Sequence, residues 1–295
     1  MNLANLYFQM NQRERARDIC REAVAVFRQF DSFDNLSIAY LVLGNVMSGM
    51  GDWAGAIVVW REGASVDEAR GDLRSQAEKL LCIAQATVMQ RYRGPGQAIP
   101  QPAYDEAMSL YERARELVSG FTDPQAVALV ANSFQTQGQT ASACGRIADA
   151  IQYLEQARVT YAGLGWRMQT AITDSLLGLV CMEAGRLLSP AYYADAETHH
   201  RRALEYFEQA GMRDQCWLAK YYLADTAYRR GFYAADAGTR NEHWQSAAGF
   251  IEQAAADIEL IRGGYVESDA ENNLATRISL VSNKEKVYVF AIQLN

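Results

Sequence analysis

Histidine is scarce in this 295-residue chain, and its scarcity limits the chemistry that the chain can carry. Only three histidines occur. His199 and His200 are adjacent, so on a helix they would point about 100° apart and could not easily share a metal ion. A nucleophile pair such as Cys216 with His200 would lack a third group to orient or activate it. No GxxxxGK[ST] or GxGxxG motif occurs for a nucleotide. We therefore expect no metal, no cofactor and no catalytic residue.

The chain also lacks any clustering of cysteine. Its five cysteines are so scattered that no two lie closer than 35 residues, which excludes a CxxC zinc or redox motif. An odd number of unclustered cysteines is typical of reduced thiols in a cytoplasmic protein.

Basic charge and long apolar runs are lacking as well. The formal net charge is −7. An acidic balance argues against nucleic acid, which needs a face rich in Lys and Arg, and against anionic membranes. No apolar run approaches the roughly 18–20 residues that span a bilayer, and no signal peptide opens the chain. We expect neither nucleic acid nor a membrane as a partner.

What the chain does contain is an internal repeat. In the first half of each unit, a small residue is followed by a small or apolar residue after three positions and, in most units, by glycine after seven. The small residues that begin this pattern are Ala4, Gly44, Ala84, Gly138, Gly178 and Ala224. They are separated by 40, 40, 54, 40 and 46 residues. A unit of 40 residues with occasional insertions explains this spacing, whereas a generic helical bundle would not keep it.

The second half of each unit has its own pattern, in which a small residue is followed by an apolar residue four positions later and by another small residue three positions after that. It begins at Ala16, Ala56, Ala107, Ala150, Ala196 and Ala247. Offsets of three, four and seven place these residues on one helical stripe. Small residues let two helices approach closely, large ones such as Trp60 and Tyr111 fill the gap to the next pair, and glycine ends the first helix.

These spacings resemble the tetratricopeptide repeat (TPR) family. The resemblance implies an all-α, right-handed α-solenoid of about six helix-turn-helix repeats plus a terminal helix pair, in a single domain over 1–295. The expected repeats lie near 1–31, 35–66, 73–119, 125–162, 167–210 and 214–262, with the terminal pair at 267–294. Enlarged turns are expected at 92–102, 187–193 and 232–242, and a helix end at Gly263-Gly264.

The segment RISLVSNKEKVYVFAIQL, at 277–294, is similar to the helix pair that closes TPR arrays just upstream of CHAT domains. CHAT domains are caspase-like cysteine peptidases whose pattern needs a His-Gly dipeptide and a later cysteine. No histidine here is followed by glycine. The resemblance implies that the chain is the non-catalytic, regulatory part of a longer protein and would contact a C-terminal catalytic domain.

In TPR arrays the first helices line a concave groove, and the family pattern gives the positions that face it. Among these positions, the residues expected to bind a ligand are Asn45, Gln85, Asn132, Gln135, Gln139, Ser175, Met182, Tyr221, Asp225, Tyr228 and Arg229. Amide side chains can both donate hydrogen bonds to a peptide backbone and accept them from it. Met and Tyr side chains can make apolar contacts with ligands of different shapes. The carboxylate clamp of chaperone-binding TPR domains is not expected, because its Lys and Arg positions hold Phe8, Gln9, Leu41 and Gly49.

Three functions remain open. The first is a scaffold that binds a protein or peptide in the groove and regulates a CHAT-type peptidase. The alternative is a peptide- or protein-sensing module of a signalling or transcription regulator, which a neighbouring DNA-binding helix-turn-helix would favour. The third is an enzyme, which needs a convergent polar site inside the array; we expect no enzyme.

Overall fold

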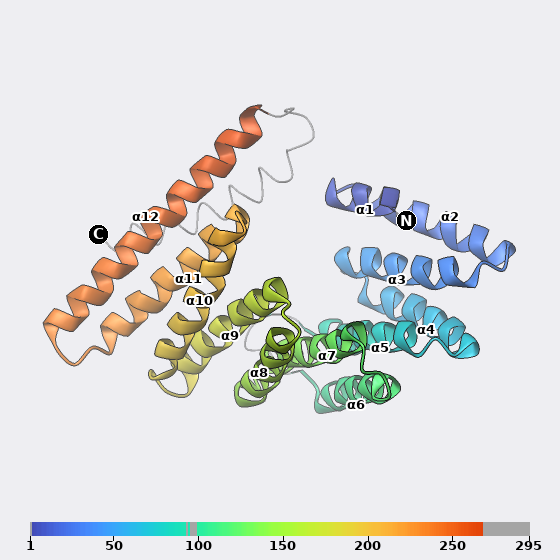
Figure 1. Ribbon diagram of the computed structural model, residues 1–295, viewed down its shortest axis with the longest axis horizontal. Helices are drawn as coiled ribbons and strands as arrows, with labels where there is room; N and C mark the ends of the chain where they lie inside the picture. The colour runs from blue at the N-terminus through green and yellow to red at the C-terminus, as the bar shows by residue number, and fades with distance from the viewer. Residues whose placement is uncertain (1, 93, 95–98, 268–295) are drawn as a thin grey trace. The chain divides into compact units, whose positions relative to one another are not determined.

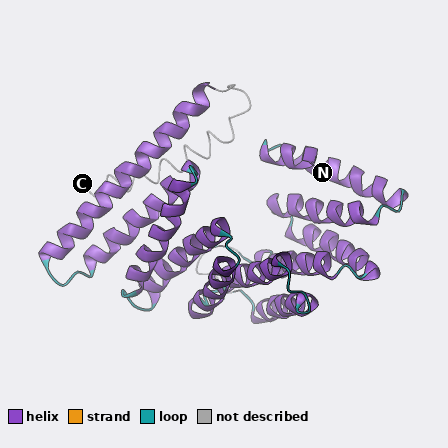
Figure 2. Ribbon diagram, in the orientation of Figure 1, coloured by secondary structure: helices purple, strands orange, loops and turns teal. Residues whose placement is uncertain are grey.

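The computed structural model describes residues 2–92, 94 and 99–267, and these residues form helices and loops without any strand (Figure 2). The expected all-α fold is confirmed. The helices are α1 (Asn2–Gln9), α2 (Arg13–Gln29), α3 (Phe33–Gly49), α4 (Trp53–Arg70), α5 (Leu73–Met89), α6 (Gln101–Val118), α7 (Pro124–Ala143), α8 (Ile147–Gly163), α9 (Arg167–Leu187), α10 (Tyr192–Gln209), α11 (Arg213–Phe232) and α12 (Ala237–Glu267).

The helices form pairs within two compact units, Met1–Thr160 and Tyr161–Asn295. In the first unit each helix from α1 to α7 packs on the next, and in the second α9 to α12 do the same (Figure 1). Alternate helices also touch, because α3 contacts α5, α5 contacts α7, and α9 contacts α11. These are the first helices of successive pairs, so first helices stack on first helices. The single domain over 1–295 stays a prediction.

Small residues lie where the two helices of a pair come closest. A Cβ at Gly44 would collide with the indole of Trp60, which donates a hydrogen bond to the carbonyl of Leu41 at 3.2 Å. A Cβ at Gly138 would lie 2.7 Å from Cγ of Leu154. A bulky side chain at either glycine would therefore push the pair apart.

Glycine does not end every first helix as expected. Gly51 and Gly145 have φ values of 83° and 73° and follow the ends of α3 and α7, as predicted. Gly185 and Gly231 instead lie inside α9 and α11, so the prediction that they end these helices is wrong.

The reason is that these two glycines make room for aromatic rings. A Cβ at Gly185 would lie 2.6 Å from the ring of Tyr193, and a Cβ at Gly231 would collide with Trp244. Both rings come from the second helix of the same pair. Close approach, rather than a left-handed backbone, is what requires glycine here.

Two of the expected enlarged turns, at 187–193 and 232–242, are also wrong. The connections span only 188–191 and 233–236, because the helices on either side are longer. Asp236 explains the second case, since its carboxylate accepts a hydrogen bond from the backbone N–H of Thr239 at 2.8 Å and so begins α12 early. The connection 90–100 is long, as expected, although 93 and 95–98 lie outside the described residues.

The helix end expected at Gly263-Gly264 is wrong as well, because α12 continues through both glycines to Glu267. Each glycine costs a helix about 1 kcal/mol relative to alanine, which by itself is too little to end a helix of 31 residues. The terminal helix pair expected at 267–294 lies, apart from Glu267, outside the described residues. Over the residues that are described, no helix combines the length and the apolar character needed to cross a membrane.

Candidate ligand-binding face

All eleven residues predicted to bind a ligand are accessible. Asn45 is exposed and the other ten are half-buried, whereas residues on other sides of the same helices, such as Leu223 and Ala224, are fully buried. Leu81 and Val88 share the family register but are buried in α5. The predicted residues thus lie on an open stripe of their helices, and their binding of a ligand stays a prediction.

The predicted residues fall into two groups. Those in the first unit are Asn45 on α3, Gln85 on α5, and Asn132, Gln135 and Gln139 on α7. Those in the second unit are Ser175 and Met182 on α9, and Tyr221, Asp225, Tyr228 and Arg229 on α11. The first group consists entirely of amide side chains, and the second includes both charged and aromatic side chains.

In the second unit, an ion pair lies at the centre of the predicted stripe of α11. Nε of Arg229 donates to Oδ1 of Asp225 at 2.8 Å, and the guanidinium also bonds the hydroxyl of Tyr193. Although burial opposes it, the Asp225 carboxylate raises the pKa of Arg229 above its ordinary value. The pair still faces solvent, since the Arg229 side chain is 40% exposed.

The neighbouring first helix, α9, contributes a second charged pair. A hydrogen bond from Arg186 lowers the pKa of Glu183, and the charge of Arg229 on α11 lowers it further. We therefore define the α9–α11 face as Ser175, Met182, Glu183, Tyr221, Asp225, Tyr228 and Arg229. Glu183 belongs to the family register but was not among the predicted ligand residues.

The tyrosines of the α9–α11 face are held by aromatic neighbours. The ring of Tyr228 lies 4.9 Å from that of Phe232 and 6.3 Å from that of Trp244, whose Nε1 donates to the Tyr228 carbonyl at 3.2 Å. The ring of Tyr221 lies edge-on to Tyr222 at 5.6 Å, and burial raises its pKa. Such fixed rings offer contact area at little cost in conformational entropy.

Comparison with known proteins finds similar helical repeats. A family model described as tetratricopeptide repeat matches residues 1–29. The fold is that of a TPR-like helical array. One similar solved structure is that of a Signal Transduction ATPase with Numerous Domains (STAND) protein with a TPR sensor, from Pyrococcus horikoshii. Its sequence is 13% identical to this chain, and the TM-score is 0.56. The match covers 96% of this chain and 44% of the STAND protein.

A Rap protein complexed with competence and sporulation factor is also similar. It is 11% identical with a TM-score of 0.51, over 99% of this chain and 74% of its own. This chain therefore spans less than half of the STAND protein but most of the Rap protein. Among curated proteins, none matches the sequence.

The TPR array also contains polar pairs that the sequence analysis missed. Nζ of Lys79 lies 2.6 Å from Oδ2 of Asp67, and both side chains are buried. Further pairs are Asp174 with His199 and Lys220 with Asp257, each at 2.8 Å. Lys79, Asp174 and Lys220 all lie four or five positions before the small residue of the first helix. A charged residue four or five positions before the small residue is therefore the sequence feature from which these pairs could have been predicted.

Four cysteines of the TPR array have thiols whose pKa is raised by burial. Burial raises the pKa of Cys20 and of Cys144 to about 11 and that of Cys82 to about 12, so these thiols stay protonated at neutral pH. Burial also raises the pKa of Cys216. Within the described residues, no group of three or more His, Cys, Asp and Glu is placed to hold a metal ion. Such a fold generally serves as a scaffold.

Proposed function

We propose that this protein is a non-catalytic scaffold that binds a protein or peptide on its first helices, with the α9–α11 face as the main binding surface. The observation that carries the proposal is the half-exposed Asp225–Arg229 pair between two fixed tyrosines. The ion pair and Ser175 offer donors and acceptors to a peptide backbone, and the tyrosines and Met182 offer apolar contact.

The two similar structures support the binding of a partner and a sensing role. One is a complex with competence and sporulation factor, and the other carries a TPR sensor. These are properties of those proteins, and we extend them to this chain only by analogy of fold. They favour a peptide- or protein-sensing module of a signalling or transcription regulator.

A finer proposal is that the array regulates a CHAT-type caspase-like peptidase and contacts a catalytic domain that follows it. Its support is the similarity of residues 277–294 to the helices that precede CHAT domains. The coding sequence beyond Asn295 tests it. A continuing frame with a His-Gly dipeptide and a later cysteine supports the regulatory role, and a stop codon directly after Asn295 contradicts it. The cytoplasmic location stays a prediction.

Binding to the α9–α11 face can be tested with peptides selected from a random displayed library. A selected peptide is labelled, and its affinity is measured by fluorescence anisotropy. We expect the double variant Tyr221→Ala with Arg229→Ala to bind at least about tenfold more weakly, because truncated aromatic and arginine residues dominate such losses. The matched control, Tyr153→Ala with Arg158→Ala on α8, should bind as the wild type does. Equal affinity of the first variant and the wild type would contradict the proposal.

A further inference from the structure

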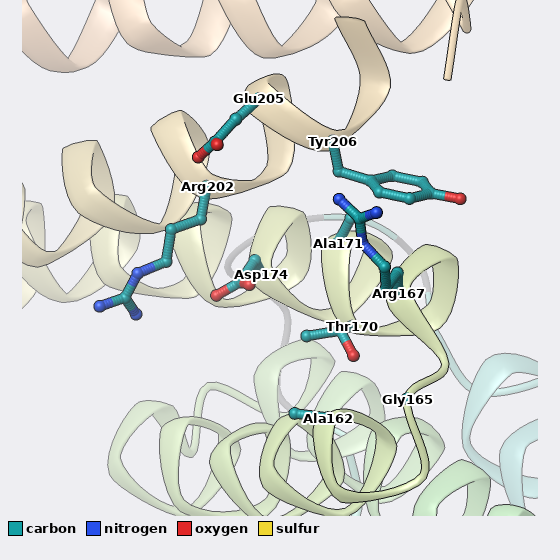
Figure 3. A pocket seen from close by; sticks show the side chains of 9 residues that line it. All are labelled: Ala162, Gly165, Arg167, Thr170, Ala171, Asp174, Arg202, Glu205 and Tyr206. Carbon is teal, nitrogen blue, oxygen red and sulfur yellow. The ribbon is translucent and has the colours of Figure 1, made fainter. Parts of the chain in front are cut away.

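A pocket of about 290 Å³ lies in the second unit, apart from the α9–α11 face (Figure 3). It is formed by the end of α8, the loop at Gly165, the first half of α9 and the second half of α10. Consecutive residues of a helix point about 100° apart, so Asp174 in the pocket and Ser175 on the α9–α11 face lie on different sides of α9. The polar side chains that line the pocket are Arg167, Thr170, Asp174, Arg202, Glu205 and Tyr206.

The inner part of the pocket presents hydrogen-bond acceptors. Asp174 is only 4% exposed. Nδ1 of His199 lies 2.8 Å from Oδ1 of Asp174 and donates a hydrogen bond to it, which fixes the orientation of the Asp174 carboxylate. The hydroxyl of Thr170 donates to the carbonyl of Trp166 at 3.0 Å, so its lone pairs remain able to accept. A group with N–H donors and positive charge therefore suits this end.

The rim of the pocket presents positive charge. The guanidinium of Arg167 lies 5.5 Å from the ring centroid of Tyr206 and donates to Oε1 of Gln209 at 2.8 Å, which holds it in place. Arg202 extends from α10 and is exposed. Figure 3 shows the two guanidinium groups on opposite sides of Asp174 in this view.

These charges select a ligand that carries both signs. The two arginines balance the carboxylates of Asp174 and Glu205, so a simple cation would face both arginines. A simple anion would face Asp174, whose buried charge is screened less by solvent than the exposed ones. The volume lies at the lower end of the range of ligand pockets, about 300–1,000 Å³, so the ligand is small.

We propose that this pocket binds a small zwitterion, a free amino acid or a dipeptide. The ammonium group lies at Asp174 and Thr170, and the carboxylate lies at one of the two arginines that flank Asp174, Arg167 or Arg202. The pocket is separate from the α9–α11 face, so the array would bind this small ligand independently of a peptide on that face.

Isothermal titration calorimetry of the full chain tests the proposal. The probes are the common amino acids and glycylglycine, each at about 10 mM, a concentration that detects millimolar affinity. Butylamine and butanoate, which carry one charge each, are the chemical controls. We expect at least one zwitterion to bind saturably and both single-charge compounds to bind at least about tenfold more weakly, because each meets only half of the site.

Variants locate the binding. Asp174→Asn, which keeps the shape of the carboxylate, should weaken binding at least about tenfold. Since Asp174 is buried and Asp174→Asn could fail to fold, Arg167→Gln with Arg202→Gln provides an exposed alternative with the same expected loss. Asp195→Asn, at an exposed residue of α10 that does not line the pocket, is the matched control and should bind as the wild type does. The proposal is overturned if no zwitterion binds the wild type, if butylamine or butanoate binds equally well, or if the arginine variant binds normally.

Discussion

His200 is fully buried in the second unit, and neither of its ring nitrogens has a hydrogen-bond partner among the described residues. The ring stacks on Tyr222, with 5.2 Å between the ring centroids, and lies directly over Gly178. Burial, and to a smaller degree the charge of His199, lowers the pKa of His200 to about 3. In an unfolded chain the pKa of histidine is about 6.5.

This difference makes the free energy of unfolding depend on pH. Between the two pKa values the unfolded chain binds a proton at His200 that the folded chain does not bind. The folded state is therefore most favoured above about pH 6.5, and its stability falls as the pH drops towards 3, by about 1.4 kcal/mol for each pH unit.

The variant His200→Leu removes both the titration and the two unpaired nitrogens. Leucine fits this environment, because Leu154 occupies the corresponding place over Gly138. Leaving buried polar groups unpaired costs about 1–3 kcal/mol, so we expect the variant to be more stable than the wild type by about 1 kcal/mol near pH 7. The difference should widen by about 1.4 kcal/mol for each pH unit below 6.5.

Urea unfolding followed by circular dichroism between about pH 7 and pH 5 measures these differences. Thr198→Ala is the control, because this exposed position on α10 has no titratable group, and the variant should keep the pH dependence of the wild type. If His200→Leu has the same pH dependence as the wild type, the burial of an unpaired, neutral His200 is refuted.

Further predictions concern packing inside each unit and are measured by the same unfolding assay. Lys79→Met should lower the free energy of unfolding by about 3–5 kcal/mol, because it leaves Asp67 buried without its ion-pair partner. Adding Asp67→Leu should recover most of the loss, and a double variant as unstable as the single one would contradict this. Gly44→Ala should cost about 1–3 kcal/mol, because its Cβ would collide with Trp60. Gly249→Ala, with nothing within 4 Å of the new Cβ, should instead stabilise α12 by up to about 1 kcal/mol, and equal effects at the two glycines would refute the packing argument.

The spacing of small residues predicted the helix pairs because each small residue meets a large one across its pair, as Gly44 meets Trp60. The same reasoning failed at Gly185 and Gly231. A glycine can end a helix, or it can leave space for an aromatic ring. Which of these roles it has depends on the side chain that a neighbouring helix packs against it. Tyr193, which fills the space at Gly185, lies outside the local pattern that the spacing describes.

Some features of the candidate site could likewise be predicted from the sequence, and others could not. That Tyr221 and Asp225 are accessible follows from helical periodicity, so it could be predicted from the sequence. The effect of Arg229 on Glu183, and the pairing of Asp174 with His199, join side chains of different helices. Such contacts depend on how helices pack, so the pocket at Asp174 could not be predicted from the sequence.

A peptide bound on the first helices of the second unit would shield their backbone amides from solvent. Hydrogen–deuterium exchange is therefore measured with and without a selected peptide. We predict that the peptide slows exchange in α9 and α11, around Met182 and from Tyr221 to Arg229. Slowed exchange confined to α10 and α12, with α9 and α11 unchanged, would contradict binding on the first helices.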